Sequence, residues 1–485
     1  MNVRRRFFLA SLVLLVAPAF SQTPPNLGAG GQVGAEHLDL TLLHTNDLHG
    51  HVLPHVYAEE GFPGGKGEFV RGGIARIATL ARKLKREIKN PAMLIDIGDT
   101  ATRGPLTNAY EGIADAEAMN AAGYELGVIG NNEFKLKDGY ERKDNFGAQA
   151  ALMQVIRRTN FPWLCANAGG EPQKFFPGVG PFLVREIQGV RVGFLGLTAP
   201  RSASYPQTVG WWIGDPVESA KKWIPIARKE CDVLIALTHI GIDDDKKLVA
   251  ATSGIDAVVG GDSHTFIYKP EIVNNAEGKP VPIVQDGEFG VNLGRFDLHF
   301  AKTPTGWTLA KYEYALLPIT EKIKEAKDVK AVADRFARPL QSEIVARLPE
   351  SFIGKTPEER TKLTAVATME GIRRGVGADL GATVPGDGSF NVFRSASVSL
   401  YDLRAAWPFK NKVATASLTG AELSTLQTKF PALVLSPGNA PLDSTKTYTV
   451  ALIDFVASGS LGISADKLTD TGKDMRDAFV AGWAK

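Results

Sequence analysis

Cysteine is nearly absent from this chain of 485 residues, which has only Cys165 and Cys231. Two thiols can form neither a disulfide framework nor a zinc site built from cysteine, so we interpret both as buried thiols. A surplus of either charge is lacking as well, because 55 Lys and Arg residues face 53 Asp and Glu residues and leave a net charge of +2. Without a long block of positive charge, binding to a nucleic-acid duplex is not expected.

Long hydrophobic runs are lacking after the N-terminus, where no stretch approaches 18 consecutive apolar residues. Stable insertion into a membrane is therefore not expected. The N-terminus combines a basic start with an apolar run and a cleavage point after Ser21, which predicts a cleaved export signal over residues 1–21. The pair Arg5 and Arg6 resembles a twin-arginine signal, and a general secretory signal remains the alternative. We therefore expect a periplasmic or secreted protein.

Apart from these absences, the composition is that of a globular protein, with 44% apolar and 22% charged residues. Short apolar runs typical of buried strands alternate with stretches of helical periodicity. The strand-like runs are residues 38–43, 92–97, 126–129, 190–197, 233–237, 257–259 and 282–284, and the helical stretches include 73–89 and 216–229. This alternation predicts an α/β domain with a layered sheet.

The length of the chain predicts two or three domains. A charged helical segment without an apolar strand, residues 321–345, is interpreted as a linker helix. It would join a first domain over residues 38–320, preceded by a flexible leader over residues 22–37, to a second domain over residues 346–485. The second domain has its own helical stretches and strand-like runs, which are residues 362–375, 421–428, 413–418 and 448–452.

Polar side chains follow five of the apolar runs in the first domain, each time at the carboxyl end of the run. These residues are Asp47, His49, Asp99, Asn131, His239, Asp262 and His264. Since open α/β sheets bind their ligands at the carboxyl ends of the strands, we expect these side chains to meet at one edge. Glycines beside them, such as Gly98 and Gly130, would let the backbone turn sharply there.

The set mixes carboxylate, amide and imidazole donors and is large enough for two divalent ions. Mn²⁺ is the ion we expect, with Mg²⁺, Zn²⁺ or iron as alternatives. Two ions about 4 Å apart and bridged by a carboxylate suit the hydrolysis of a phosphate ester, because they acidify a bound water and neutralise charge on the phosphoryl oxygens. The residues alone therefore predict a dinuclear metal site for hydrolysis.

Ordered motifs surround these residues. They are residues 43–51 (LHTNDLHGH), 72–76 (GGIAR), 96–99 (DIGD), 130–134 (GNNEF), 238–241 (THIG) and 260–264 (GGDSH). With them the chain resembles the calcineurin-like metallophosphoesterases, specifically the two-domain bacterial 5'-nucleotidase family that includes UDP-sugar hydrolases and cyclic-nucleotide phosphodiesterases. The resemblance implies a β-sandwich flanked by helices and joined to a smaller α/β C-terminal domain that supplies the substrate pocket.

The resemblance also implies roles for individual residues. One ion would be held by Asp47, His49 and His264, with Asp99 bridging, and the other by Asn131, His239 and Asp262. Asn131 and Asn132 would contact the phosphoryl oxygens during catalysis.

Two positions depart from the family's motifs. The third motif normally reads Gly-Asn-His-Glu, and Asn132 stands in place of its His, which contacts the phosphate and helps the leaving group depart. An amide cannot supply a proton, so a contribution of about 10²–10⁴ to the rate would be missing. The fifth motif normally begins with a His ligand where this chain has Asp262, and a carboxylate favours Mn²⁺ or Mg²⁺. His51 and His55 are candidate replacements nearby in the sequence.

The second domain resembles the family's C-terminal domain over residues 390–423. Arg394 occupies the position of an arginine that contacts substrate, and a guanidinium suits a phosphate. Residues 457–463 lie where nucleotidases have a Gly-Gly-Asp-Gly-Phe type loop, but Leu461 and Ile463 replace its Asp and Phe. This loop therefore gives no support for nucleotide specificity.

The leading hypothesis is an exported phosphoesterase that depends on two metal ions and acts on a small phosphomonoester or phosphodiester by attack of a metal-bound hydroxide. A nucleotide-like ester is one candidate substrate. One alternative is a sulfur-oxidation hydrolase that resembles the thiosulfohydrolase branch of the same architecture. The other is a non-catalytic relative that binds a metal or an anion without turnover.

Overall fold

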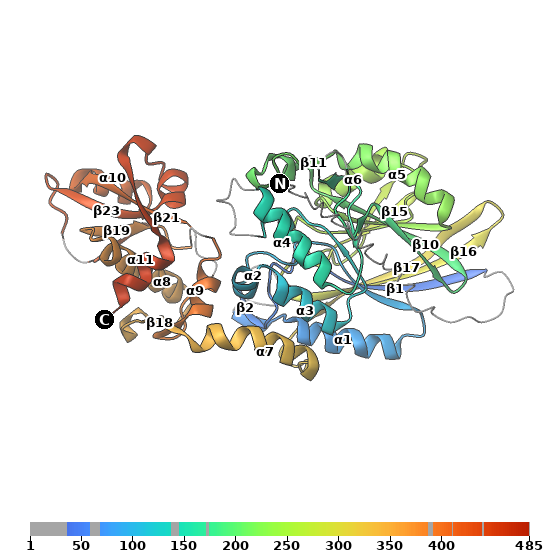
Figure 1. The fold of residues 1–485 in the computed structure, drawn as a ribbon, viewed down its shortest axis with the longest axis horizontal. Coiled ribbons are helices and arrows are strands. Elements are labelled where there is room, and N and C mark those ends of the chain that lie inside the picture. The colour runs from blue at the N-terminus through green and yellow to red at the C-terminus, as the bar shows by residue number, and fades with distance from the viewer. Residues whose placement is uncertain are drawn as a thin grey trace, which may run out of the picture.

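The computed structural model describes residues 36–58, 68–136, 145–170, 174–386, 391–409, 411–438 and 441–484. Two lobes are visible in Figure 1, the larger from the N-terminal residues and the smaller from the C-terminal residues. Helix α7 (Lys327–Ser342) runs beneath the larger lobe toward the smaller one. The predicted export signal lies outside the described residues. Among the residues that are described, no helix combines the length and the apolar character needed to cross a bilayer.

Two large sheets form the centre of the larger lobe. The first has the order β17 (Gly306–Pro318), β16 (Asn292–Thr303), β1 (His37–Thr45), β4 (Ala92–Asp96), β5 (Leu126–Val128), β6 (Trp163–Leu164) and β8 (Val179–Gly180). The second has the order β14 (Glu271–Asn274), β15 (Pro280–Val284), β13 (Ala257–Gly260), β12 (Val233–His239), β10 (Val190–Thr198) and β9 (Phe182–Ile187). Two small ribbons accompany them, β2 (His55–Ala58) with β3 (Glu68–Arg71) and β7 (Ala168–Gly169) with β11 (Trp212–Ile213).

The apolar runs form strands because their alternate side chains enter different cores. In β1, Leu42 packs in the cluster between the two sheets, whereas Leu43 belongs to the cluster beneath the helices on the outer face. This period of two is the geometry of a strand that is covered on both faces. Strand β1 pairs in parallel with β4 and antiparallel with β16, so its carboxyl end lies beside that of β4.

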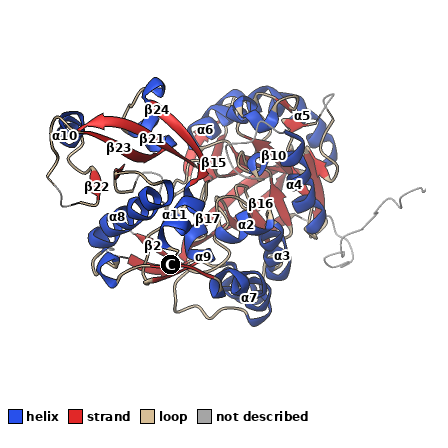
Figure 2. Cartoon of the chain, turned by 60° about the vertical axis from the view of Figure 1, so that its left-hand side comes forward, coloured by secondary structure: helices blue, strands red, loops and turns tan. Residues whose placement is uncertain are grey.

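Helices cover both outer faces of the sheet pair. The first sheet is covered by α1 (Ile74–Glu87), α2 (Pro105–Tyr110), α3 (Ile113–Ala122), α4 (Asn145–Arg158) and α7, and the second by α5 (Pro216–Glu230) and α6 (Ile242–Ala251). Figure 2 shows the strands enclosed by these helices. The predicted α/β sandwich flanked by helices is confirmed.

The smaller lobe has its own core. Its sheet has the order β22 (Val434–Ser436), β19 (Leu380–Thr383), β23 (Thr447–Ile453), β21 (Lys412–Thr419) and β24 (Leu468–Asp474), and β18 (Ile344–Arg347) pairs with β20 (Ser397–Ser399). Its helices are α8 (Pro357–Val376), α9 (Leu400–Ala406), α10 (Gly420–Lys429) and α11 (Met475–Trp483). Capping boxes at Thr356, Ser399 and Thr419 fix where α8, α9 and α10 begin.

Two expectations about segment ends need correction. The segment expected as a linker helix over residues 321–345 is helical only over Lys327–Ser342. Beyond it the backbone becomes extended, because Ile344–Arg347 pairs with Ser397–Ser399 and tertiary pairing overrides local helical preference. The leader expected over residues 22–37 ends too late, since His37 is already the first residue of β1 and pairs with Ala301.

Candidate functional site

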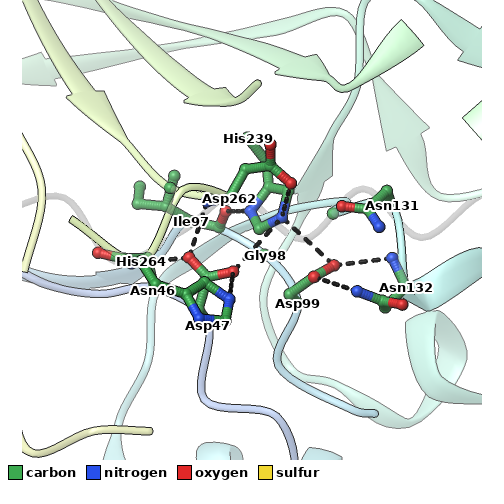
Figure 3. Close-up of polar contacts among 12 residues, drawn as sticks. Asn46, Asp47, Ile97, Gly98, Asp99, Asn131, Asn132, His239, Asp262 and His264 are labelled. Carbon is green, nitrogen blue, oxygen red and sulfur yellow. Dashed lines mark hydrogen bonds and ion pairs between the residues drawn. The ribbon is translucent and has the colours of Figure 1, made fainter. Parts of the chain in front are cut away.

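Strand ends from both large sheets bring the expected metal ligands into one neighbourhood. Strands β1, β4 and β5 lead to Asp47, Asp99 and Asn131, and strands β12 and β13 end at or before His239 and Asp262. Figure 3 shows these side chains approaching one another from the two sheets. The arrangement follows from parallel pairing, because the carboxyl ends of neighbouring parallel strands share one sheet edge.

A first group of side chains converges on Asp47. Its Oδ1 lies 3.6 Å from His49 Nε2 and 3.2 Å from His264 Nε2. The two imidazole nitrogens are themselves 3.0 Å apart. The His264 Nδ1 pairs with Glu288, which turns the Nε2 of that ring toward Asp47.

A second group shares Asp47 with the first. His239 Nε2 lies 3.3 Å from Asp99 Oδ1 and 3.7 Å from Asp47 Oδ1. Its Nδ1 donates a 2.7 Å hydrogen bond to the carbonyl of Ile97, which fixes the ring and leaves Nε2 facing the carboxylates.

Two buried atoms in these groups have no hydrogen-bond partner among the described residues. They are Asp47 Oδ1 and His239 Nε2. Buried polar atoms without a hydrogen bond need another partner, and each of these two lies beside an ionisable group, with Asp47 Oδ1 3.2 Å from His264 Nε2 and His239 Nε2 3.3 Å from Asp99 Oδ1. Carboxylate and imidazole are donors that a divalent ion accepts, and the residues around Asp47 therefore fit one.

Two carboxylates determine the protonation of His239. Burial alone would lower the pKa of His239, but the carboxylates of Asp99 and Asp47 outweigh it and hold that pKa well above its usual value. Burial lowers the pKa of His49 to about 3, so this imidazole is neutral and available as a ligand at neutral pH. The same carboxylates that draw a proton onto His239 would attract a metal cation.

Five of the expected ligands have a left-handed backbone. The φ values are 51° for Asp47, 45° for His49, 53° for Asp99, 81° for Asp262 and 54° for His264. Residues with a side chain rarely adopt this conformation, which costs roughly 1–2 kcal/mol each. Strain of this kind gathers at functional sites, where surrounding contacts enforce it.

Glu133 fixes the backbone beneath the site, a role the sequence did not reveal. Its carboxylate accepts hydrogen bonds from the backbone N–H groups of Asp99 (2.9 Å), Gly130 (2.8 Å) and Ala101 (3.1 Å). The loops after β4 and β5 are thereby tied together. The signal that could have found it is its place in the third motif, next to Asn131 and Asn132.

The remaining expected residues contact other side chains. Asn132 donates its backbone N–H to Asp99 Oδ1 at 2.7 Å, and its Nδ2 also donates to Asp99. Asn131 and Asp262 both bind the guanidinium of Arg201, a residue that the sequence did not suggest. Arg201 follows the run that forms β10, so its position at the same sheet edge was the signal available.

The family model for calcineurin-like phosphoesterases matches residues 40–266. This chain carries a calcineurin-like phosphoesterase domain. The matched range includes all seven expected ligands. The family resemblance predicted from the motifs is confirmed, and the family description agrees with the predicted class of hydrolase acting on phosphoesters.

Relatives of known name match beyond the phosphoesterase domain. The trifunctional nucleotide phosphoesterase YfkN of Bacillus subtilis is 28% identical over 420 residues, which is 79% of this chain and 27% of that protein. A 5'-nucleotidase of Bos taurus is 29% identical over 306 residues, 58% of this chain and 51% of that protein. The chain thus spans between a quarter and about half of the length of these relatives.

Solved structures share the fold of both lobes. A 5'-nucleotidase precursor from Thermus thermophilus has a TM-score of 0.66 at 23% identity, over 92% of this chain and 96% of that one. The sulfate thiohydrolase SoxB from Thermus thermophilus has a TM-score of 0.64 at 17% identity, over 92% of this chain and 94% of that one. The predicted combination of a phosphoesterase domain and a C-terminal domain therefore recurs in known structures.

Lys135 adds a buried positive charge to the phosphoesterase domain beside Asn132. Its Nζ lies 3.3 Å from Asn132 Oδ1 and 3.5 Å from the ring centroid of Tyr205. Burial lowers the pKa of this ammonium to about 8. The ammonium is therefore charged below pH 8 and loses its charge as the pH rises through that value.

Binding of an anion next to Asn132 should weaken as Lys135 loses its proton. With saturating metal, the inhibition constant of inorganic phosphate is expected to rise about tenfold between about pH 7 and pH 9, because a hydrogen bond from a charged group contributes roughly 1.5 kcal/mol or more. Lys135→Arg keeps its charge over this range and should flatten the profile, whereas Lys135→Met should bind phosphate weakly throughout. An unchanged pH dependence in Lys135→Arg would contradict this role.

The hydrogen bonds of the Arg394 guanidinium go to Glu68 and not to the expected metal ligands. Its guanidinium forms two hydrogen bonds of 3.0 Å with the carboxylate of Glu68 in β3, and Arg360 pairs with the same carboxylate. This contact joins the smaller lobe to the larger one. The structure thus places the expected substrate-binding arginine on a carboxylate of its own chain.

The two candidate replacement histidines also lie elsewhere. The rings of His51 and His55 lie tilted against each other beside Phe289, with the two imidazole centroids 4.1 Å apart. His51 Nδ1 donates to the carbonyl of Leu48 at 2.9 Å. Neither belongs to the groups of described His, Cys, Asp and Glu residues that lie close enough together to hold a metal ion.

Proposed function

We propose that this chain is an exported phosphoesterase that depends on divalent metal and hydrolyses a small phosphomonoester or phosphodiester, with a nucleotide-like ester as one candidate substrate. The observation that carries the proposal is the buried approach of Asp47 Oδ1 and His239 Nε2, which have no hydrogen-bond partner within the described residues and lie among carboxylate and imidazole groups. The family description and the relatives named 5'-nucleotidase support the phosphoester class. Export rests on the predicted signal over residues 1–21.

The residues divide the work of holding metal. Asp47, His49 and His264 would hold one ion, with Asp99 and His239 alongside. The family resemblance assigns a second ion to Asn131, His239 and Asp262, of which His239 and Asp262 lie 3.5 Å apart. Mn²⁺ is the proposed ion because the carboxylates of the site suit it, with Mg²⁺ as an alternative for the same reason and Zn²⁺ or iron as alternatives that suit the imidazoles. When bound, such an ion supplies positive charge to the phosphoryl oxygens and lowers the pKa of a coordinated water toward neutrality.

The chain's own groups would orient the substrate. Asn131 and Asn132 are proposed to contact the phosphoryl oxygens, and the ammonium of Lys135 adds positive charge beside them. Arg394 is proposed to bind the anionic group of the substrate after exchanging Glu68 for it, because a guanidinium that already holds a carboxylate bidentately has the geometry for a phosphate. Substrate entry would then loosen the contact between the lobes.

The test is hydrolysis by the purified mature protein across p-nitrophenyl phosphate, its bis-ester, 5'-nucleotides, cyclic nucleotides and a thiosulfate conjugate, with added Mn²⁺ and with chelator. Turnover of phosphate esters that chelator abolishes and Mn²⁺ restores is the expected result. Turnover of the thiosulfate conjugate alone would replace the proposal by the sulfur-oxidation alternative. If none of these substrates is hydrolysed while metal is still bound, the protein is a non-catalytic binding protein.

A further inference from the structure

Two of the three side chains expected to hold the second metal ion, Asn131 and Asp262, already share a cation. Arg201 donates from Nη1 to Asp262 Oδ2 at 2.7 Å and from Nη2 to Asp262 Oδ1. The same Nη2 donates to Asn131 Oδ1 at 3.0 Å. The guanidinium therefore lies between the oxygen of Asn131 and both oxygens of Asp262, and it occupies the oxygens that these two residues would offer to a second ion.

The hydrogen bonding of buried polar atoms differs between the surroundings of Asp47 and those of Asp262. Around Asp47, the atoms Asp47 Oδ1 and His239 Nε2 accept no hydrogen bond and donate none among the described residues, and the groups beside them are a carboxylate and an imidazole. The oxygens of Asn131 and Asp262, in contrast, accept hydrogen bonds from Arg201. Both metal-compatible groups found among the described residues contain Asp47, and neither contains Asp262.

The negative charge of Asp262 explains why Arg201 lies beside it. Asp262 stands where the family's fifth motif has a neutral histidine, so this chain has one more carboxylate at that position. The side chain of Asp262 is only 6% exposed, and a buried carboxylate needs a partner of opposite charge. Arg201 supplies that partner in a bidentate fork, the strongest form of carboxylate recognition.

The surroundings of Arg201 hold it in this position. It lies in the short 3₁₀ helix Pro200–Ser204 after β10, and the hydroxyl of Ser204 donates to its carbonyl at 2.8 Å. Tyr205 accepts a 3.0 Å hydrogen bond from Asn131 Nδ2, which orients the amide so that its oxygen faces Arg201. Half of the Arg201 side chain, 51%, remains exposed, so the guanidinium can also meet an anionic ligand from the solvent side.

We propose that Arg201 takes the place of the second metal ion, so that the protein holds one divalent ion around Asp47 and a fixed guanidinium supplies the second positive charge to the substrate phosphate. The inference rests on the metal dependence stated in the proposed function. It replaces a dinuclear site by a site of one ion and one arginine.

Metal stoichiometry tests the proposal without reference to activity. The full-length mature protein is dialysed against excess Mn²⁺, and bound manganese is counted per chain by elemental analysis. One ion per chain is expected for the unchanged protein and two for Arg201→Gln, because the glutamine frees the oxygens of Asn131 and Asp262. The double variant Arg201→Gln with Asp262→His should also hold two ions.

Electron paramagnetic resonance gives an independent readout, because two neighbouring Mn²⁺ ions are magnetically coupled and a single ion is not. Arg191→Gln is the matched control, since Arg191 is 50% exposed and forms a similar fork with Asp232 away from the site. This control should keep one uncoupled ion. Thermal unfolding of each variant checks that it folds.

Each outcome decides between the alternatives. Two ions in the unchanged protein, or one ion in both Arg201 variants, would overturn the role of Arg201. No ion in the unchanged protein would reject the metal dependence of the proposed function as well. One ion together with absence of any hydrolysis would leave the role of Arg201 in metal binding intact and reject the phosphoesterase activity, so the two failures are distinguishable.

Discussion

Asp99→Ala is expected to abolish metal binding and hydrolysis together. The carboxylate lies 3.3 Å from His239 Nε2 and 3.8 Å from His49 Nε2, so it contacts both halves of the site. Its removal takes away a charged ligand whose contribution to charge stabilisation is several kcal/mol, which corresponds to a loss of about 10³ or more in kcat/KM. Bound manganese and hydrolysis of p-nitrophenyl phosphate are the two measurements.

Two further variants separate the metal from the fold. Asp99→Asn keeps the shape and an oxygen that can accept the 2.7 Å bond from the backbone N–H of Asn132, but it lacks the charge. It should fold and still bind metal poorly. Asp297→Asn changes another buried carboxylate, which accepts a hydrogen bond from Thr41 within the first sheet, and should keep metal and turnover. Retention of both in Asp99→Ala would refute the assignment of Asp99.

Asn132→His should raise turnover of phosphate esters whose leaving group needs a proton. Asn132 is 4% exposed and bonded to Asp99, so a histidine there would lie within reach of the same phosphate. General-acid assistance contributes about 10²–10⁴ to a rate, and we expect a gain at the lower end, about 10²-fold. Lys135 next to it disfavours a second positive charge, which is the reason for the lower value.

The leaving group provides the control for this gain. An alkyl phosphate should respond strongly to Asn132→His, whereas p-nitrophenyl phosphate, whose phenolate leaves without a proton, should respond little. Asn132→Ala removes the amide without supplying a proton and should raise neither rate. If Asn132→His changes the rate for neither ester, the side chain at position 132 serves another chemistry.

The sequence predicted the fold and the neighbourhood of the ligands because both depend on local pattern. Asp47, Asp99 and Asn131 each stand within three residues of a strand that is apolar enough to be buried on both faces. Parallel pairing then brings the strand ends together without further information. The hairpin of β16 and β17 was not predicted from apolar runs. Strand β17 lies at the edge of the sheet, and its side chains are mostly exposed or half-buried.

The sequence did not predict which charged side chains pair with each other, because such pairs depend on tertiary contact. Arg201 is 61 residues away from Asp262, and Glu68 is 326 residues away from Arg394. Nothing local marks an arginine after a strand as the partner of a particular carboxylate. The substitution at Asp262 was visible, but its compensation by Arg201 became visible only in the folded chain.

A left-handed backbone holds the side chains of the site in place at a cost in folding stability. The five residues concerned are Asp47, His49, Asp99, Asp262 and His264. Glycine adopts such φ values freely, so Asp262→Gly would relieve local strain of roughly 1 kcal/mol while it removes a functional side chain. Replacement by glycine would therefore exchange the chemistry of the site for relief of backbone strain. Attempts to stabilise the protein by substitution should leave these five positions untouched, since relief of strain there would be obtained only by removing the side chains of the site.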